Sequence, residues 1–596
     1  MEDTREIKRT NNVINILARL LDEKWSAWVI NLLVIPGLLA ASLLLPPISL
    51  KERVFEAGFS EIDAAGGSVV DPDGTQLTIP SEGVLSRFRV QLHSVPRTEF
   101  LEGSAGRALR QAAEKIPSHL VMRSPLYSVA WRGEEPPSEV VLSVPIPNDS
   151  EPYSSLDLYE WAGEQWEWLP HDLIAEDDLL ESELDTLPAN FAIFQSQSAP
   201  PMLGANLSAD ATLPAQAGQA LAEIYPMGLY MAGDGSIVGS LPETAGSGET
   251  GFNVIPTICN WGPDGVVRND LTDNMLVLAE RRDAHIQAIV NLVVDNVFSG
   301  VEIYYRRVNP DLREEFVLFV EKLAEALHAQ GKTLALRVDP PAQIAEDRWD
   351  TGGYDWAGLG RAADVFRFEA IRRPDAWQPN GQMSQLLTWA AGRVDRYKLQ
   401  PILSTHSLDE VGHTLTDIPY SKALVSFGQI ALANSNVVNP GEHITFALKA
   451  AAESGGVRFD AATATYSFSY VDDAGQKHTV YLENATSIAH KLRVLSQYNL
   501  RGVSFANLLG EENDLLVWPV VREYNQLVVS PVQSDFSAIW TVRKASGEPI
   551  LTEPRPLEDA SYEWTAPQEP GEYTVGVAIS GDGGKTTYAS TRVAMI

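Results

Sequence analysis

The chain has 596 residues, enough for two to four domains that each bury their own core. With 45 Lys and Arg against 79 Asp and Glu, its formal net charge is −34, which excludes nucleic acid as an expected partner. The single cysteine, Cys259, excludes an internal disulfide, and we interpret it as a small buried hydrophobe.

Near the N-terminus, residues 27–45 carry no charge. At 1.5 Å rise per residue, such a helix nearly crosses a bilayer core of about 30 Å. We predict a cytoplasmic segment 1–24 and a transmembrane anchor 25–47, with the bulk of the chain extracytoplasmic, because more Lys and Arg precede the span than follow it closely. The alternative is a cleaved signal peptide, which the long preceding segment and Pro46-Pro47 disfavour.

The next region, 66–197, has β character. Two short β-rich runs flank Asp73-Gly74, which is typical of a hairpin turn. Further strands are predicted at 140–144, 156–161 and 191–195. We predict a β-sandwich, in which the tryptophans around 158–168 pack the sheets together; contact with sugar is the alternative.

Residues 198–221 are rich in Ala, Pro, Gly and Ser and are interpreted as a linker. From 222 to 525, strand and helix patterns alternate, which predicts a parallel sheet and, at this length, a closed (β/α)8 barrel. Barrel chemistry lies at the carboxyl ends of the strands. Tyr305 and Arg306, at the end of a strand from Gly300, are therefore expected at the mouth.

Several segments of this region carry a family resemblance. Gly300-Val301-Glu302-Ile303-Tyr304-Tyr305-Arg306 and the helix around 321–328 resemble glycoside hydrolase family 18, in its spore-coat and LysM-associated bacterial branch. Three more stretches resemble the same branch: Tyr225-Pro226 to Ser236 before the strand, and Tyr466 to Tyr470 with Val480 to Ala485, and Tyr498 to Phe505, after it. The resemblance covers about residues 222 to 525.

The resemblance implies a catalytic motif, Asp-Gly-x-Asp-x-Asp-x-Glu, on the strand. In the family the Glu protonates the glycosidic oxygen, and the Asp before it orients the N-acetyl group of the substrate. The four acidic positions are occupied here by Ser299, Glu302, Tyr304 and Arg306, and the expected sugar-stacking Trp by Ala506. Arginine keeps its proton at any working pH and is no general acid. The motif is degenerate.

A relocated acid would restore hydrolysis, and Glu369, Glu511 and Glu512 are the candidates, with Asp339 as another mouth residue. Glu302 shares the inward face with Arg306 but lies more than about 10 Å deeper in the barrel. We predict that Glu302 is a buried ion-pair partner of an arginine such as Arg306 or Arg337.

Ligand contacts are predicted for five residues near the mouth: Tyr305, Arg306, Arg372, Trp261 and Trp377. Arginine forks bind carboxylates, so an acidic glycan or an acidic envelope protein is one candidate ligand. The alternative is that Arg306, Arg307, Arg372 and Arg373 only neutralise neighbouring acids. No metal or cofactor is predicted, because no histidine pair has ligand spacing and no phosphate-binding glycine loop occurs.

The last region, 526–596, has alternating apolar residues from Phe536 to Val542, and the segment around Tyr573 is typical of a tyrosine corner, which predicts an immunoglobulin-like sandwich. The leading hypothesis is a membrane-anchored extracytoplasmic protein whose barrel binds glycan or acts in envelope assembly without catalysis. The alternatives are an active glycosidase on N-acetylglucosamine polymers such as chitin or peptidoglycan, and a structural protein-interaction subunit.

Overall fold

The computed structural model describes residues 58–209, 211–243, 251–345, 348–432, 437–450, 456–534, 536–557, 561–581 and 586–595. The described residues divide into two compact units: those up to Ser94, with Tyr127–Ser143 and Glu183–Asn190, form the first, and the other described residues form the second. The predicted segments 1–24 and 25–47 lie outside the described residues. Within the described ranges, no helix combines the length and apolar character needed to cross a membrane.

The first unit consists of short antiparallel strands. These are β1 (Ser60–Ile62), β2 (Gly67–Val70), β3 (Gln76–Ile79), β4 (Phe88–Val95), β6 (Leu126–Arg132) and β7 (Val140–Pro145). Strand β3 pairs with both β2 and β7, while β1 pairs with β4. Gly74 has φ +98° in the turn between β2 and β3, a conformation that favours glycine. The predicted hairpin at Asp73-Gly74 is confirmed.

The second unit begins with further strands of the predicted N-terminal β region. They are β5 (Leu120–Met122), β8 (Leu156–Trp161), β9 (Trp166–Leu169), β10 (Asp172–Ile174), β11 (Leu179–Leu184) and β12 (Asn190–Ser196). Trp161 pairs with Trp166 across the β8–β9 hairpin, and both are 8% exposed. The ring centroid of Trp166 lies 4.9 Å from that of Phe194. These tryptophans therefore pack the core, as the sequence interpretation favoured.

A closed parallel barrel follows. Its strands are β13 (Met202–Leu207), β14 (Glu223–Pro226), β17 (Asn253–Val254) with β18 (Thr257–Cys259), β19 (Gly300–Tyr304), β20 (Thr333–Val338), β23 (Val365–Glu369), β24 (Leu399–Ser404) and β33 (Gly502–Ala506). β17 and β18 are two halves of one strand, because the first pairs with β14 and the second with β19. With that strand counted once, eight strands close where β13 pairs with β33, and the barrel is confirmed.

The first barrel strand corrects the sequence interpretation. Residues 198–221 were expected to be a linker, but they contain β13 and the short helix α7 (Ala217–Ala220). Strand β13 lies between β33 and β14 and pairs in parallel with both. The barrel therefore begins about twenty residues before the predicted boundary at 222.

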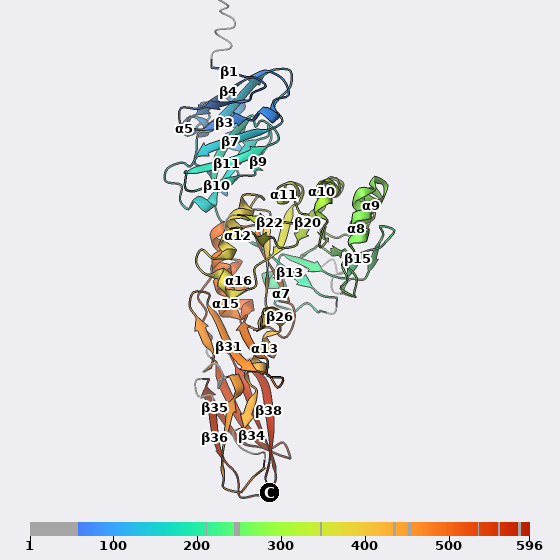
Figure 1. Cartoon of the computed structure of the whole chain (residues 1–596), viewed down its shortest axis with the longest axis vertical. Coiled ribbons are helices and arrows are strands. Elements are labelled where there is room, and N and C mark those ends of the chain that lie inside the picture. Colours follow the sequence, from blue (N-terminus) through green and yellow to red (C-terminus); the bar gives the residue numbers. More distant parts are fainter. Residues whose placement is uncertain are drawn as a thin grey trace, which may run out of the picture. The chain divides into compact units, whose positions relative to one another are not determined.

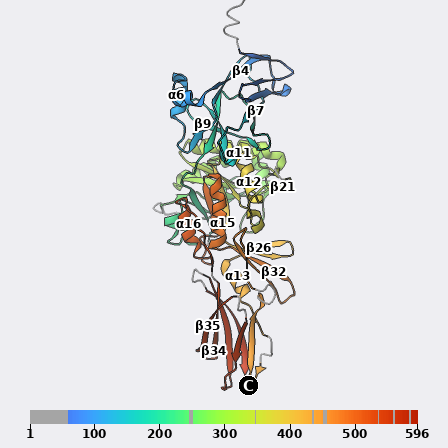
Figure 2. The ribbon, with the colours of Figure 1, turned by 90° about the vertical axis from the view of Figure 1, so that its left-hand side faces the viewer.

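Helices connect the strands and cover the outside of the barrel. They are α8 (Asn269–Val277), α9 (Ala279–Asp295), α10 (Arg313–His328), α11 (Trp356–Ala362), α12 (Gln382–Ala391), α15 (Ala485–Leu495) and α16 (Val517–Tyr524). In Figure 1, α8, α9 and α10 lie together beside the barrel strands, and Figure 2 shows α15 next to α16. Phe316, Phe319 and Leu323 of α10 are fully buried, as its apolar spacing predicts.

A long insertion between β24 and β33 builds two further structures. A hairpin of β25 (Ser407–Val411) and β26 (Thr414–Ile418) continues through β32 (Lys477–Leu482) and β31 (Thr465–Val471) to β30 (Arg458–Asp460). Between β26 and β30 along the chain come helix α13 (Tyr420–Phe427) and the strands β27 (Ile430–Leu432), β28 (Val437–Val438) and β29 (His443–Leu448).

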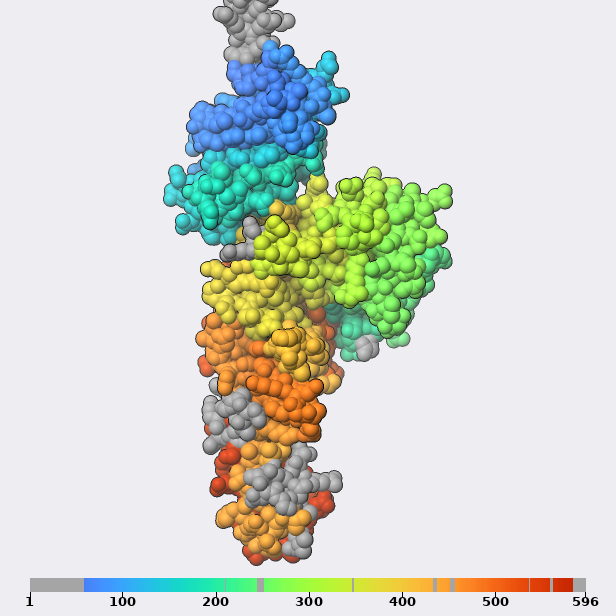
Figure 3. All heavy atoms as spheres, in the orientation of Figure 1, coloured from blue at the N-terminus to red at the C-terminus, as the bar shows by residue number. Residues whose placement is uncertain are grey.

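The C-terminal strands and the insertion share one sandwich. Its C-terminal strands are β34 (Ser537–Lys544), β35 (Pro549–Pro556), β36 (Ser561–Thr565), β37 (Glu572–Ser580) and β38 (Thr586–Met595). One sheet has the order β27-β29-β36 and the other β28-β38-β37-β34-β35. Figure 3 shows orange atoms of the insertion among red atoms of the C-terminal strands. The predicted domain 526–596 thus omits three strands that complete it.

Candidate functional site

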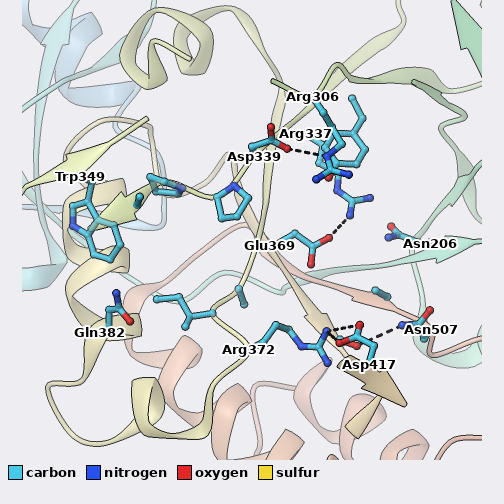
Figure 4. Close-up of a pocket in the computed structure, with 18 of the residues that line it drawn as sticks. Asn206, Arg306, Arg337, Asp339, Trp349, Glu369, Arg372, Gln382, Asp417 and Asn507 are labelled. Carbon is cyan, nitrogen blue, oxygen red and sulfur yellow. Dashed lines mark hydrogen bonds and ion pairs between the residues drawn. The ribbon is translucent and has the colours of Figure 1, made fainter. Parts of the chain in front are cut away.

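The main pocket lies at the carboxyl ends of the barrel strands and has a volume of about 860 Å³. Residues at or just after the ends of all eight barrel strands line it, among them Asn206, Trp261, Asp339, Glu369 and Asn507. Figure 4 shows these side chains around the opening, together with three arginines. This is where barrel proteins bind their ligands.

Arg306 occupies the mouth at the end of β19. Its backbone N–H donates to Asn260 Oδ1 and its backbone carbonyl accepts from Asn260 Nδ2, both at 2.9 Å. The guanidinium Nε donates to Asp339 Oδ1 at 3.3 Å, and the guanidinium carbon lies 5.6 Å from the centroid of the Trp261 ring. The side chain is 41% exposed. A cationic donor therefore stands where the resemblance implies a catalytic Glu.

Arg337 forms the second arginine–carboxylate pair of the pocket. Its Nη2 donates to Glu369 Oε1, and its guanidinium lies over the Tyr304 ring with 4.1 Å to the centroid. Tyr304 is 7% exposed, and burial raises the pKa of its phenol to about 12. The phenol therefore keeps its proton near neutral pH, and Glu369 is engaged in the ion pair with Arg337.

Arg372 forms the third pair with a residue of the insertion. Its Nη1 donates to both carboxylate oxygens of Asp417, at 2.7 and 2.6 Å, and its Nη2 donates to the carbonyl of His406 at 3.0 Å. Among the described residues that line the pocket, three arginines thus face three carboxylates. Their formal charges sum to zero, which fits the alternative that the arginines neutralise neighbouring acids.

Beneath the pocket lies a fully buried ion pair. Glu302 accepts from Arg367 Nη1 and, at 2.5 Å, from Thr257 Oγ1. Arg367 Nη2 also donates to Asn206 Oδ1 at 2.8 Å and to Ser504 Oγ at 2.6 Å. The predicted burial and pairing of Glu302 are confirmed, but its partner is Arg367 and neither Arg306 nor Arg337.

The structure places the other predicted ligand-contact residues in different surroundings. Arg306, Arg372 and Trp261 line the pocket. Tyr305 is fully buried on the helix side of β19, where its hydroxyl bonds His285 Nε2 at 2.5 Å. Trp377 is 1% exposed and donates from Nε1 to the Ile371 carbonyl at 2.8 Å. Tyr305 and Trp377 are therefore packing residues.

The residues predicted as relocated acids lie at different places. Glu369 lines the main pocket, whereas Glu511 lines a smaller one of about 430 Å³ that shares Asn206 and Asn507 with it. Glu512 lines neither of these pockets and accepts from Ser421 Oγ at 3.4 Å. Ser299 lies at the opposite end of β19, where its N–H donates to the Val254 carbonyl at 3.0 Å.

Several pocket residues were missed from the sequence. Asn206 lies in the segment interpreted as a linker, and Asp417 lies in the insertion. Asn507 and Gln382 carry no motif that would distinguish them. A parallel-strand pattern at 202–207 was the one available signal, since it would have brought Asn206 to the mouth.

The geometry defines a (β/α)8 barrel with a polar pocket at its mouth and a modified strand motif. Residues 250–508 match the family model Glycosyl hydrolases family 18. The chain therefore contains a glycosyl hydrolase family 18 domain, which confirms the resemblance.

Three curated relatives are proteins of Bacillus subtilis strain 168. The chain is 21% identical over 259 residues to the "Uncharacterized glycosylase YvbX", covering 43% of this chain and 69% of that one. It is 22% identical over 283 residues to the "Putative sporulation-specific glycosylase YdhD", covering 46% and 62%. A "Cortical fragment-lytic enzyme" is 21% identical over 231 residues, with 37% and 49% covered. The matches thus span about half to two thirds of these relatives.

A solved structure with a similar fold is the chitinase from Chromobacterium violaceum ATCC 12472. It is 21% identical to this chain and covers 55% of it, with 99% of its own length matched and a TM-score of 0.43.

Proposed function

We propose that this protein is a membrane-anchored extracytoplasmic protein whose barrel binds glycan without hydrolysing it. The observation that carries the proposal is the set of three arginine–carboxylate pairs around the pocket. One of these arginines, Arg306, holds the position of the family's acid. Each pocket carboxylate accepts a hydrogen bond from an arginine, and the position of the family's acid carries no carboxyl group.

A second observation supports the absence of hydrolysis. The family's substrate-assisted mechanism needs a carboxylate beside the acid to orient the N-acetyl group. That position is Tyr304, whose pKa of about 12 keeps it neutral. A neutral phenol can donate a hydrogen bond but cannot stabilise the positive charge that develops on the substrate.

The pocket nevertheless retains features suited to a saccharide. Trp261 and Trp349 supply flat apolar surfaces, and Asn206, Gln382 and Asn507 add amide donors and acceptors. The family domain and the glycosylase names of the relatives support a sugar ligand. The uncharged segment 27–45 and the Lys and Arg that precede it support the anchor and the orientation.

Hydrolysis and binding are measured on the full-length chain in detergent. We expect no release of reducing ends from chitin oligosaccharides or peptidoglycan fragments, and calorimetric binding of at least one of them. Trp261→Ala should weaken that binding about tenfold, whereas Trp131→Ala, an exposed tryptophan outside the pocket, should not. Reducing ends released by both the wild type and Arg306→Ala would contradict the proposal. Binding of a protein partner without any glycan would favour a structural subunit.

One observation favours an active enzyme as the second candidate. Glu369 lines the pocket and is 29% exposed, so a substrate that displaced Arg337 would reach it. In that case Glu369→Gln would abolish hydrolysis while Glu512→Gln, outside the pocket, would leave it intact. Equal rates for the two variants would exclude Glu369 as the acid.

A further inference from the structure

Arg306 is the one pocket arginine with an open guanidinium fork. Its Nε is used by Asp339, while Nη1 and Nη2 have no hydrogen-bond partner among the described residues. Arg337 donates from Nη2 to Glu369. Arg372 donates from Nη1 to Asp417 and from Nη2 to the carbonyl of His406. Because Arg306 is also the most exposed of the three, its two terminal nitrogens are available to a ligand.

The surrounding structure holds this fork in place. Asn260 is 1% exposed and clamps the Arg306 backbone from both sides. The next residue, Arg307, has φ +53° and donates its N–H to Asp339 Oδ2 at 2.8 Å. The Tyr354 hydroxyl donates to the Tyr305 carbonyl at 2.7 Å and lies 3.2 Å from the same Asp339 oxygen. The side chain is thus presented at the mouth from a fixed backbone.

Asp339 does not block an anion at this position. Its oxygens accept from Arg306 Nε and from the Arg307 N–H, and the Tyr354 hydroxyl lies 3.2 Å from one of them, so its hydrogen bonds among the described residues do not use Arg306 Nη1 or Nη2. The Trp261 ring beside the guanidinium adds a flat surface for a sugar ring. Two parallel N–H groups of a guanidinium match the two oxygens of a carboxylate, a geometry that a hydroxyl cannot reproduce.

We infer that the pocket takes a glycan whose sugar carries a carboxylate substituent, and that Arg306 is the residue that selects it. This inference rests on the proposed glycan-binding function. Arg306 replaces the family's acid. It cannot donate a catalytic proton, but it can bind the anionic group of a ligand. The pocket would then prefer an acidic sugar to a neutral one of the same shape.

The test compares two probes that differ only in charge. The first is the disaccharide of N-acetylglucosamine and N-acetylmuramic acid, whose lactyl ether bears a carboxylate, and the second is its methyl ester. Calorimetry with the full-length chain in detergent should give a Kd about tenfold lower for the acid than for the ester. In Arg306→Gln this ratio should fall to about one, and in Arg306→Lys it should take an intermediate value, because the charge remains and the fork is lost.

Arg373→Gln is the matched control. Arg373 is an exposed arginine that pairs with Asp375 and Glu410 and does not line the pocket, so the preference for the acid should persist. Equal affinity of the wild type for acid and ester, or a preference that survives Arg306→Gln, overturns the inference while leaving glycan binding intact. If neither probe binds and no chitin oligosaccharide or peptidoglycan fragment binds, the proposed function itself fails.

Discussion

Glu302 and Arg367 form a fully buried ion pair inside the barrel. Removing two charges from water costs several kcal/mol per ion, and the mutual attraction offsets this only if the remaining polar atoms find partners. Here Thr257 donates to Glu302, and Asn206 and Ser504 accept from Arg367 Nη2, whereas Arg367 Nε has no hydrogen-bond partner among the described residues. The ring of Tyr225 covers the Arg367 guanidinium, with 3.4 Å between the ring centroid and the guanidinium carbon. The pair therefore joins residues from several strands at one level of the barrel.

Glu302→Gln removes the counter-charge and leaves a buried guanidinium. We expect the free energy of unfolding of the barrel to fall by about 3–5 kcal/mol, measured by urea denaturation. Asp375→Asn, which breaks an exposed pair with Arg373, should change it by less than about 1 kcal/mol. If both variants change the free energy of unfolding by a similarly small amount, Arg367 remains buried without its counter-charge at little cost.

Sequence patterns predicted half of this arrangement. Strand alternation places Glu302 inside the barrel, so burial and the need for an arginine follow directly. The choice among arginines depends on the stagger of β19 against β23, two strands that are not neighbours. Local periodicity carries no information on that offset, and for this reason Arg367 was not recognised as the partner.

Strand β13 shows how composition can conceal an element. Its residues Gly204 and Ala205 are small, and small residues in a segment rich in Pro and Ser favour a linker interpretation. The structure gives the physical reason for the glycine. A Cβ at position 204 would lie 2.8 Å from Tyr225 Cε2 and 3.2 Å from Ser504 Oγ, so larger side chains are excluded by close packing.

Gly204→Val should therefore destabilise the barrel by about 1–3 kcal/mol, because the inserted methyl groups displace the Tyr225 ring. The measurement is the midpoint of thermal unfolding. Gly218→Ala in α7 is the control, since the nearest atom to its added Cβ would be 3.9 Å away, and it should be neutral or slightly stabilising. If 198–221 were a linker, both substitutions would leave the midpoint unchanged.

At the scale of the whole molecule, a partly buried acid makes stability depend on pH. Burial raises the pKa of Asp395 to about 6 from an ordinary value of 3.8. Between these values the unfolded chain loses the proton that the folded chain keeps, so the contribution of Asp395 to stability is greatest below pH 4 and is lost as pH rises through 6. Its Oδ1 accepts from the Tyr397 N–H at 3.0 Å, and an amide oxygen would preserve that bond.

Asp395→Asn should consequently raise the free energy of unfolding at pH 8 by up to about 2 kcal/mol relative to the wild type, and the gain should vanish below pH 4. Denaturation curves at several pH values measure it. A gain that is independent of pH would assign the effect to packing and remove the electrostatic explanation.

The large-scale organisation was predictable to the extent that it follows from local periodicity. Alternating strand and helix patterns gave the barrel, and ordered motifs gave its family. The pocket was predicted in part: strand ends placed Arg306 at the mouth, but Asp417 comes from an insertion whose approach depends on tertiary packing. Tyr305 was predicted to contact a ligand, but side chains alternate along a strand, so its side chain points away from that of Tyr304 and is fully buried.

The sandwich shared by the insertion and the C-terminus has a consequence for biosynthesis. Strand β29 leaves the ribosome well before β36, its partner, and β34 of the facing sheet. Synthesis at about 5–20 residues per second makes this delay on the order of 5–20 s. During it the apolar row Ile444, Phe446 and Leu448, fully buried in the finished fold, has no cover from its C-terminal strands. Ribosome stalling or truncation after the barrel would therefore yield an aggregation-prone chain, although every residue of the barrel is present.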